Sequence, residues 1–342
     1  MRRPCSGSFF GNMRRYLIWP HVIIVLGLFL VLGCGAPQTP AAGHGPAQVD
    51  VLPALSAVAL APGERLRVVA TTSIVGDVVQ NVGGEHIDLT VLLPPGTDPH
   101  TFDPTPRDVV AVADAHVVFV NGAGLEVFLE KLLQGAGGAR VVPVSYGVEL
   151  RRFEHGHEEE AGDEHAGEYD PHTWFDPNNV IVWVRNVEWA LNTLDPANVA
   201  GYQGNAAAYE AELQVLDAWI REQVAQVPPA NRCLVTDHES FSYFTQRYGF
   251  EQVGAVFPGY STLAQPSAMD LADLEAAIRT QGVRAVFVGK TVNPALAEQV
   301  AQDTGVQLVF LYTGSLGEPG DPADTYLAMM HYDVSAIVEA LR

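Results

Sequence analysis

The stretch RVVATTSIVGDVVQNVGG, residues 67–84, decides the fold of this chain. Residues 67–72 form a short run rich in β-branched side chains, which is typical of a buried strand. Residues 74–82 then carry apolar side chains at helical spacing, and the pair Gly83 and Gly84 stops the helix. A strand followed directly by a helix is the first half of a βαβ unit, so this stretch predicts a parallel sheet.

The same alternation continues on both sides of one long helical stretch. Before it, further strands are expected at 89–93, 115–121 and 140–144, and helices at 107–113 and 126–133. After it, strands are expected at 233–236, 251–257, 285–288 and 307–311, and helices at 241–248, 267–281, 294–304 and 323–341. Between them, a helix from Asp195 and Pro196 to about residue 227 is long enough to act as a rigid strut.

These elements predict an α/β protein with two lobes, each a parallel-type sheet flanked by helices, joined by one long rigid helix. The expected boundaries are 65–190 for the first lobe, 191–228 for the linking helix and 229–342 for the second lobe. Ligands of open parallel sheets bind beyond the carboxyl ends of the strands, so the expected site lies in a cleft between the lobes.

The N-terminal region has the order of a secretory signal. Basic residues at 14–15 precede an apolar run at 16–32, and small residues surround Cys34. We therefore expect residues 1–33 to be a signal peptide. An uncleaved membrane helix is the alternative, because the run is just long enough to span a bilayer.

Residues 31–34 read Val-Leu-Gly-Cys and resemble the lipobox of bacterial lipoproteins, in which the cysteine is acylated. The resemblance implies an exported protein that a lipid on Cys34 anchors to a membrane, at the cell surface or in the periplasm. An ordinary cleavage site near this cysteine is the alternative. Residues 34–64 are rich in Ala, Pro and Gly with few charges, which predicts a flexible tether.

Charge and cysteine content exclude several classes of partner and site. The 342 residues include 40 acidic and 19 basic side chains, for a formal net charge of −21. Such a surface repels nucleic acid and attracts divalent cations. Of the three cysteines, Cys5 and Cys34 lie in the expected export segment, so Cys233 alone cannot form a thiolate metal cage within one chain.

A repeated motif supplies the candidate site. Asp-Pro-His occurs at 98–100 and again at 170–172, and each proline restricts the backbone just before a histidine. A third histidine, His238, directly follows the strand expected at 233–236. A single loop histidine is usually a surface residue, but three imidazoles on separate loops at strand ends predict a site for a borderline metal ion such as zinc.

Three aspartates lie close enough in sequence to orient these imidazoles: Asp103, Asp176 and Asp237. Helix caps or turn residues are the alternative for each of them.

The segment 153–170 interrupts the alternation with histidines among acidic residues. Such a segment cannot bury itself and is expected to be solvated. Its histidines are His155, His157 and His165. They predict an auxiliary, low-affinity metal site that gathers zinc near the main one; a solvated acidic loop without that role is the alternative.

Several stretches match a known family, including Leu-Pro-Pro-Gly-Thr-Asp-Pro-His at 93–100, Thr-Asp-His at 236–238 and Gln-Pro-Ser at 265–267. On these motifs the chain resembles the cluster A-I metal-binding proteins of ABC importers for zinc and manganese. The resemblance implies two lobes joined by a long helix, a metal ion bound between them, and delivery of that metal to an ABC permease. It also implies a monomer.

Carried over to this chain, the first three ligand positions of that family fall on His100, His172 and His238. Manganese-type members have Glu at the third position, so His238 favours Zn²⁺ over Mn²⁺. Coordination chemistry agrees, because manganese prefers carboxylate oxygen to imidazole.

The chain departs from the family at the fourth ligand position, where Gly314 replaces the usual Asp. Glycine has no side chain to coordinate a metal. Water is therefore the first candidate for the fourth ligand, followed by Glu239, Asp321 or Asp324.

Two other functions use the same three histidines. A metal-dependent hydrolase is one, since three His around a zinc with an open position also suits hydrolysis, with Glu239 as the base. The sequence contains no His-Glu-x-x-His motif, so we expect the chain not to be an enzyme. A metal-binding adhesin or chaperone without a transporter is the second alternative.

Overall fold

The computed structural model describes residues 52–128, 132–133, 140–152 and 169–342. All of them belong to one compact unit. Among these residues, no helix combines the length and the apolar character that a membrane crossing requires. The expected signal peptide, the acylated Cys34 and the histidines His155, His157 and His165 lie outside the described residues.

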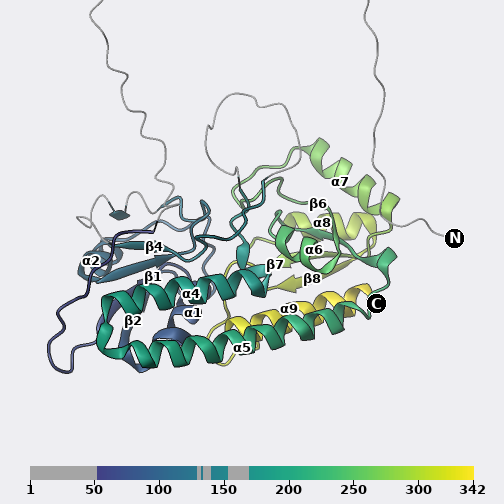
Figure 1. Ribbon diagram of the computed structural model, residues 1–342. Coiled ribbons are helices and arrows are strands. Elements are labelled where there is room, and N and C mark those ends of the chain that lie inside the picture. Colours follow the sequence, from purple (N-terminus) through teal and green to yellow (C-terminus); the bar gives the residue numbers. More distant parts are fainter. Residues whose placement is uncertain (1–51, 129–131, 134–139, 153–168) are drawn as a thin grey trace, which may run out of the picture. The chain divides into compact units, whose positions relative to one another are not determined.

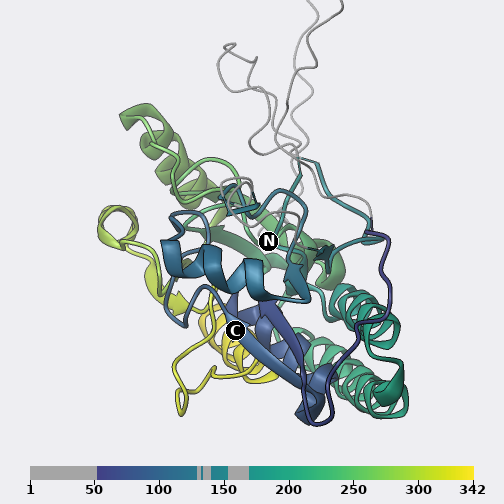
Figure 2. The ribbon, with the colours of Figure 1, turned by 90° about the vertical axis from the view of Figure 1, so that its left-hand side faces the viewer.

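The first lobe is a parallel sheet of four strands in the order β2-β1-β3-β4. It is the purple to blue part of the ribbon in Figure 1, and it faces the viewer in Figure 2. The strands are β1 (Leu66–Ala70), β2 (Ile87–Val91), β3 (Val117–Val120) and β4 (Val141–Pro143), and its helices include α1 (Ser73–Gly83) and α2 (Pro106–Asp114). Helix α1 begins where the Thr72 hydroxyl accepts the backbone N–H of Val75. The stretch at 67–84 thus forms the strand and helix that its pattern predicts.

The second lobe repeats this topology, with strands in the order β6-β5-β7-β8, all parallel. Its strands are β5 (Cys233–Thr236), β6 (Glu251–Ala255), β7 (Ala285–Gly289) and β8 (Gln307–Leu311), and its helices are α6 (Ser242–Tyr248), α7 (Ala268–Gln281), α8 (Ala295–Thr304) and α9 (Tyr326–Leu341). In each sheet, the strand that comes first in the sequence, β1 or β5, is an inner strand. The second strand pairs with one edge of it and the third strand with the other. Side chains that follow β1 or β5 therefore lie where ligands of such sheets bind.

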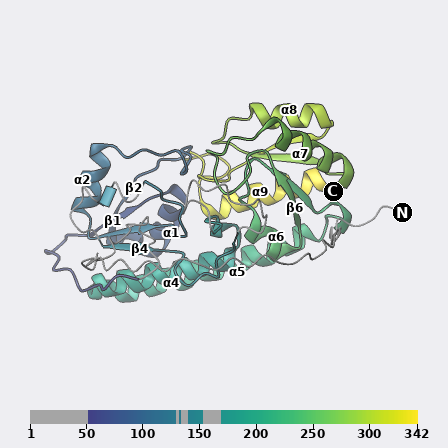
Figure 3. The same cartoon turned by 90° about the horizontal axis from the view of Figure 1, so that it is seen from above.

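Two long helices, α4 (Pro177–Leu194) and α5 (Val199–Val224), pack against each other beneath the sheets. Helix α5 runs past both lobes and contacts α1 of the first and α9 of the second (Figures 1 and 3). Its buried side chains recur every three or four residues: Tyr202, Ala206, Tyr209, Leu213, Leu216, Ile220 and Val224. One apolar cluster includes residues of β1, α5 and β7, so the two lobes share a core.

The predicted fold class, two α/β lobes joined by a long helix, is confirmed. Two details differ. Helix α4 was not expected, and it extends past the predicted boundary at 191, so the long helix begins only at Val199. Pro177 at its first turn and the Asp176 cap are helix-start signals, and the cap is the alternative that the sequence offered for Asp176.

The helix expected at 126–133 does not start at 126 either. The buried Glu126 carboxylate instead accepts the backbone N–H groups of Asn121 and Gly122 and the hydroxyl of Thr71. These bonds hold a turn at the end of β3, because a buried carboxylate must be satisfied by donors.

Candidate metal centre

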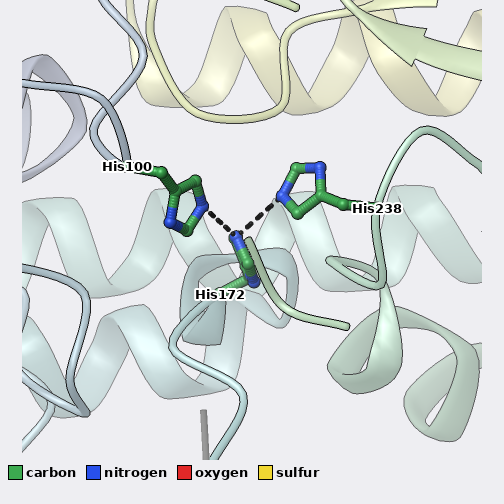
Figure 4. A group of neighbouring side chains, drawn as sticks. All are labelled: His100, His172 and His238. Carbon is green, nitrogen blue, oxygen red and sulfur yellow. Dashed lines mark hydrogen bonds between the residues drawn. The ribbon is translucent and has the colours of Figure 1, made fainter. Parts of the chain in front are cut away.

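Three histidines from separate segments meet at one point between the lobes (Figure 4). The Nε2 atom of His172 lies 3.2 Å from that of His100 and 3.1 Å from that of His238. Nitrogen ligands about 2.0–2.1 Å from a tetrahedral zinc would be separated by about 3.3 Å, which these two distances approach. All three ligand atoms lie within 4.8 Å of one another, so together they could hold a single ion.

The two Asp-Pro-His loops have the same local structure. In each, the aspartate Oδ1 accepts the backbone N–H of the histidine two residues later, at 2.9 Å in both cases. This bond closes a tight turn around Pro99 in the first loop and Pro171 in the second. The repeated sequence is thus a repeated backbone device that presents an imidazole.

The His172 ring is held on several sides. Its Nδ1 lies 2.7 Å from Asp170 Oδ1, and the second oxygen of Asp170 accepts the hydroxyl of Ser242 in a short hydrogen bond. The hydroxyl of Tyr243 donates to the carbonyl of Asp170 at 2.8 Å. In addition, Asn121 donates to the carbonyl of Pro171 at 3.0 Å. Both lobes therefore fix this ring, because Ser242 and Tyr243 belong to α6.

His238 is held in a similar way from within the second lobe. Its Nδ1 lies 2.7 Å from Asp237 Oδ1, and the other oxygen of Asp237 accepts the backbone N–H of Gly289 at 2.6 Å. Residue 289 must be glycine here, since a Cβ would lie 2.1 Å from the Thr313 hydroxyl and 3.0 Å from Asp237 Oδ2.

His100 is held less firmly than the other two. Its side chain is half-buried, whereas His172 and His238 are only 1% and 2% exposed. The second oxygen of Asp98 accepts the hydroxyl of Thr262, at 2.7 Å, rather than a hydrogen from the His100 ring. Among the described residues, no hydrogen bond engages Nδ1 of His100.

The surroundings set the charge of each ring. Burial, followed by the neighbouring imidazoles, lowers the pKa of His100 and of His172 well below the usual value, so both are neutral ligands near pH 7. Burial also lowers the pKa of His238, but the Asp237 carboxylate more than offsets this effect and the pKa is raised.

The pKa values of the two carboxyl groups beside these rings, Asp170 and Asp237, also shift in opposite directions. Burial raises the pKa of Asp170 to about 7. For Asp237, burial is outweighed by the charge and hydrogen bond of His238, and its pKa is lowered.

Of the three rings, these directions favour a proton on His238. The Nδ1 atoms of His172 and His238 face carboxylates, so their Nε2 atoms point toward each other. Two imidazole lone pairs at 3.1 Å repel unless a positive charge lies between them. In the metal-free protein, a proton on His238 meets that need; a metal ion would replace it.

The other acidic residues singled out in the sequence lie elsewhere. Asp176 caps α4 by accepting the N–H of Asn178 at 2.9 Å, and Asp103 is exposed. Asp321 and Asp324 are exposed and accept the backbone N–H groups of neighbouring turn residues.

Within the described residues, the metal-capable cluster consists of the three histidines and contains none of Glu239, Asp321 and Asp324. Gly314 lies beside the first loop, where a Cβ would be 3.0 Å from Pro99 Cδ.

Asp170, Ser242 and Thr262, which support the histidine loops, were not identified from the sequence. The aspartate two residues before each histidine was a usable signal, because Asp98 and Asp170 are both part of the repeat. No local pattern marks the two hydroxyl residues, which reach the loops only through the packing of the lobes.

Comparisons with known proteins show which family the chain is similar to. The profile of a family described as zinc-uptake complex component A, periplasmic, matches residues 68–340. The manganese-binding lipoprotein MntA of Halalkalibacterium halodurans is 33% identical over 94% of this chain and 97% of its own length. The iron-binding protein YfeA of Yersinia pestis is 30% identical over 81% of this chain and 86% of its own. The periplasmic zinc-binding protein TroA of Treponema pallidum has a similar structure, with a TM-score of 0.73, 29% identity, and coverage of 81% of this chain and 99% of that one.

Proposed function

The chain belongs to the family of periplasmic zinc-uptake components, and from that premise we propose that it captures zinc through His100, His172 and His238. As a member, it is an extracytoplasmic metal-binding protein that serves an ABC importer, and its substrate is a divalent metal ion. The family consists of transport proteins rather than enzymes, so the hydrolase alternative is set aside.

The convergence of three imidazole nitrogens around a point that needs positive charge carries this proposal. The choice of zinc over manganese rests on the ligand type. Among the described residues, the cluster offers nitrogen only, and imidazole suits zinc better than the harder manganese ion. The names of the relatives include manganese, iron and zinc, so the donor set of this chain supports the assignment better than any one of them.

Water completes the coordination in our proposal, since Gly314 offers no side chain. We further propose that a lipid on Cys34 anchors a monomer to the membrane, and that His155, His157 and His165 form the auxiliary low-affinity site. The boundaries 65–190, 191–228 and 229–342 remain our proposed division, apart from the start of the long helix at Val199.

Metal analysis and calorimetry on protein beginning at residue 35 test the function. We expect one tightly bound zinc, a weaker manganese affinity, and loss of the tight site when all three histidines are changed to Ala. Deletion of residues 153–168 is the matched control and should leave the tight site intact. Manganese bound more tightly than zinc, or tight zinc binding that survives the triple change, would contradict the proposal.

Proton release gives a second test. Because Asp237 raises the pKa of His238, this ring carries a proton at about pH 6.5 that zinc must displace. Zinc binding should therefore release protons at that pH, and affinity should fall as the pH is lowered. Calorimetry in buffers of different ionisation enthalpy measures the release; zero protons would argue against the proposed charge of the cluster.

A further inference from the structure

A polar cavity of about 540 Å³ lies next to the residues that support His172. Its wall includes four arginines, Arg151, Arg152, Arg221 and Arg247. The whole chain has only 19 basic residues against 40 acidic ones. Four guanidinium groups around one cavity are therefore unusual for this surface.

The arginines come from different parts of the fold. Arg151 and Arg152 follow the first sheet, Arg221 lies in α5, and Arg247 lies in α6. The planar guanidinium group donates in a fork that matches the two oxygens of a carboxylate or phosphate. A cavity with such groups on several walls suits a small oxyanion.

Acidic neighbours already hold two of these groups. Arg221 lies 3.1 Å and Arg247 lies 3.3 Å from oxygens of Asp217, and Arg247 is also 3.7 Å from Asp176. Glu149 lines the cavity as well. These pairs position Arg221 and Arg247. Among the described residues, the lining of the cavity has fewer carboxylates than guanidinium groups.

Arg151 is different. Its Nε atom is buried and has no hydrogen-bond partner among the described residues, and no ion pair of this side chain is seen there. A buried charged donor without an acceptor is unfavourable, because its desolvation is not offset. Arg151 also lines the cavity, so an anion bound there would offset its unpaired charge.

We propose that this cavity binds a small oxyanion, a carboxylate or phosphate group, with Arg151 as its principal donor. The site is separate from the three histidines, none of which lines the cavity. It lies close behind them, since the Tyr243 hydroxyl accepts the backbone N–H of Arg151 at 3.2 Å and donates to the carbonyl of Asp170. The proposal does not depend on which metal the histidines bind.

Titration of the metal-free full-length chain tests this site, with inorganic phosphate and succinate as probes and sodium chloride as the ionic-strength control. We expect saturable binding of at least one probe in a single site by calorimetry. A phosphate preference would indicate a tetrahedral ligand and a succinate preference a carboxylate. No saturable binding of either probe would overturn the proposal.

Two variants locate the site. Arg151→Gln should weaken binding about tenfold, as expected for a lost charge-assisted hydrogen bond. Arg185→Gln is the matched control, because Arg185 is an exposed arginine that pairs with Glu210 outside the cavity, and it should change nothing. Equal effects of the two variants, or none from Arg151→Gln, would overturn the assignment. The one-to-one zinc stoichiometry of each variant shows separately whether the metal site is intact.

Discussion

The loop at 98–100 and the loop at 170–172 have the same sequence and the same internal hydrogen bond, yet they hold their histidines differently. Asp170 uses its carboxylate both to close the turn and to orient the ring of His172. Asp98 closes the turn and then bonds to Thr262 of the other lobe, so it positions the backbone of His100 but not the ring.

The difference suggests a division within the proposed metal site. His172 is buried and fixed by both lobes, and its Nε2 contacts both other rings. His100 is only partly buried, and among the described residues no hydrogen bond holds Nδ1 of its ring. A metal ion would thus be bound by two rings that hydrogen bonds fix, His172 and His238, and by a third ring, His100, that is less constrained and more exposed to solvent.

The two histidines should show the largest contrast. We expect His172→Ala to weaken zinc binding on the order of 1000-fold and His100→Ala on the order of 100-fold, because water can replace a half-exposed ligand more readily. Competition with a chromogenic chelator measures both affinities, and circular dichroism checks the fold. Equal losses would remove the distinction between the loops.

The aspartates should show the next largest contrast. Asp170→Asn removes the carboxyl group that orients the His172 ring and should weaken zinc binding 10- to 100-fold, the range typical of such supporting groups. Asp98→Asn keeps an acceptor for the His100 N–H and should cost about threefold. The same chelator competition applies. A greater loss in Asp98→Asn would show that Asp98 matters more than its geometry indicates.

The hydroxyl groups behind the aspartates should have smaller effects. Ser242→Ala should weaken zinc binding about fivefold, and Thr262→Val about twofold, chiefly by faster dissociation. Stopped-flow chelation measures the dissociation rates. Thr291→Val is the matched control, since the Thr291 side chain makes none of the described hydrogen bonds. A dissociation rate unchanged by Thr262→Val would rule out this link between lobes as a determinant of release.

A carboxyl outside both loops gives the smallest expected effect on zinc. Asp77 of α1 accepts the backbone N–H of Tyr326 at the start of α9 and the hydroxyl of Tyr209, so it also links the lobes. Burial raises the pKa of Asp77 to about 6 from 3.8. The folded state therefore binds more protons than the unfolded one between these values, and the contribution of Asp77 to stability falls as the pH rises through that window.

Asp77→Asn removes the buried charge and keeps an acceptor. The variant should be more stable than the original protein at about pH 7.5, by on the order of 1–3 kcal/mol, and the gain should shrink toward about pH 4. Urea unfolding of metal-free protein at several pH values measures this difference. Zinc affinity should stay within about twofold, and a large change would mean that lobe contacts in general, rather than the two loops, control the metal.

Much of the fold could be predicted because its signals are local. The strand and helix at 67–84 follow from β-branched and helical patterns within a few residues, and the same holds for the alternation in the second lobe. Helix α4 was missed although it has a proline at its first turn, because Asp176, its N-cap, was interpreted as a group that orients an imidazole. At residue 126 the pattern failed because a buried carboxylate bonds to the preceding turn.

The sequence by itself determined which side chains were candidates for the centre, because the motif at 98–100 and 170–172 is local and His238 follows a strand. Only the tertiary structure decided how the three differ. Asp170 meets Ser242, and Asp98 meets Thr262, across 72 and 164 residues of chain. Such bonds exist only once the lobes pack, and no pattern within either loop encodes which hydroxyl will reach it.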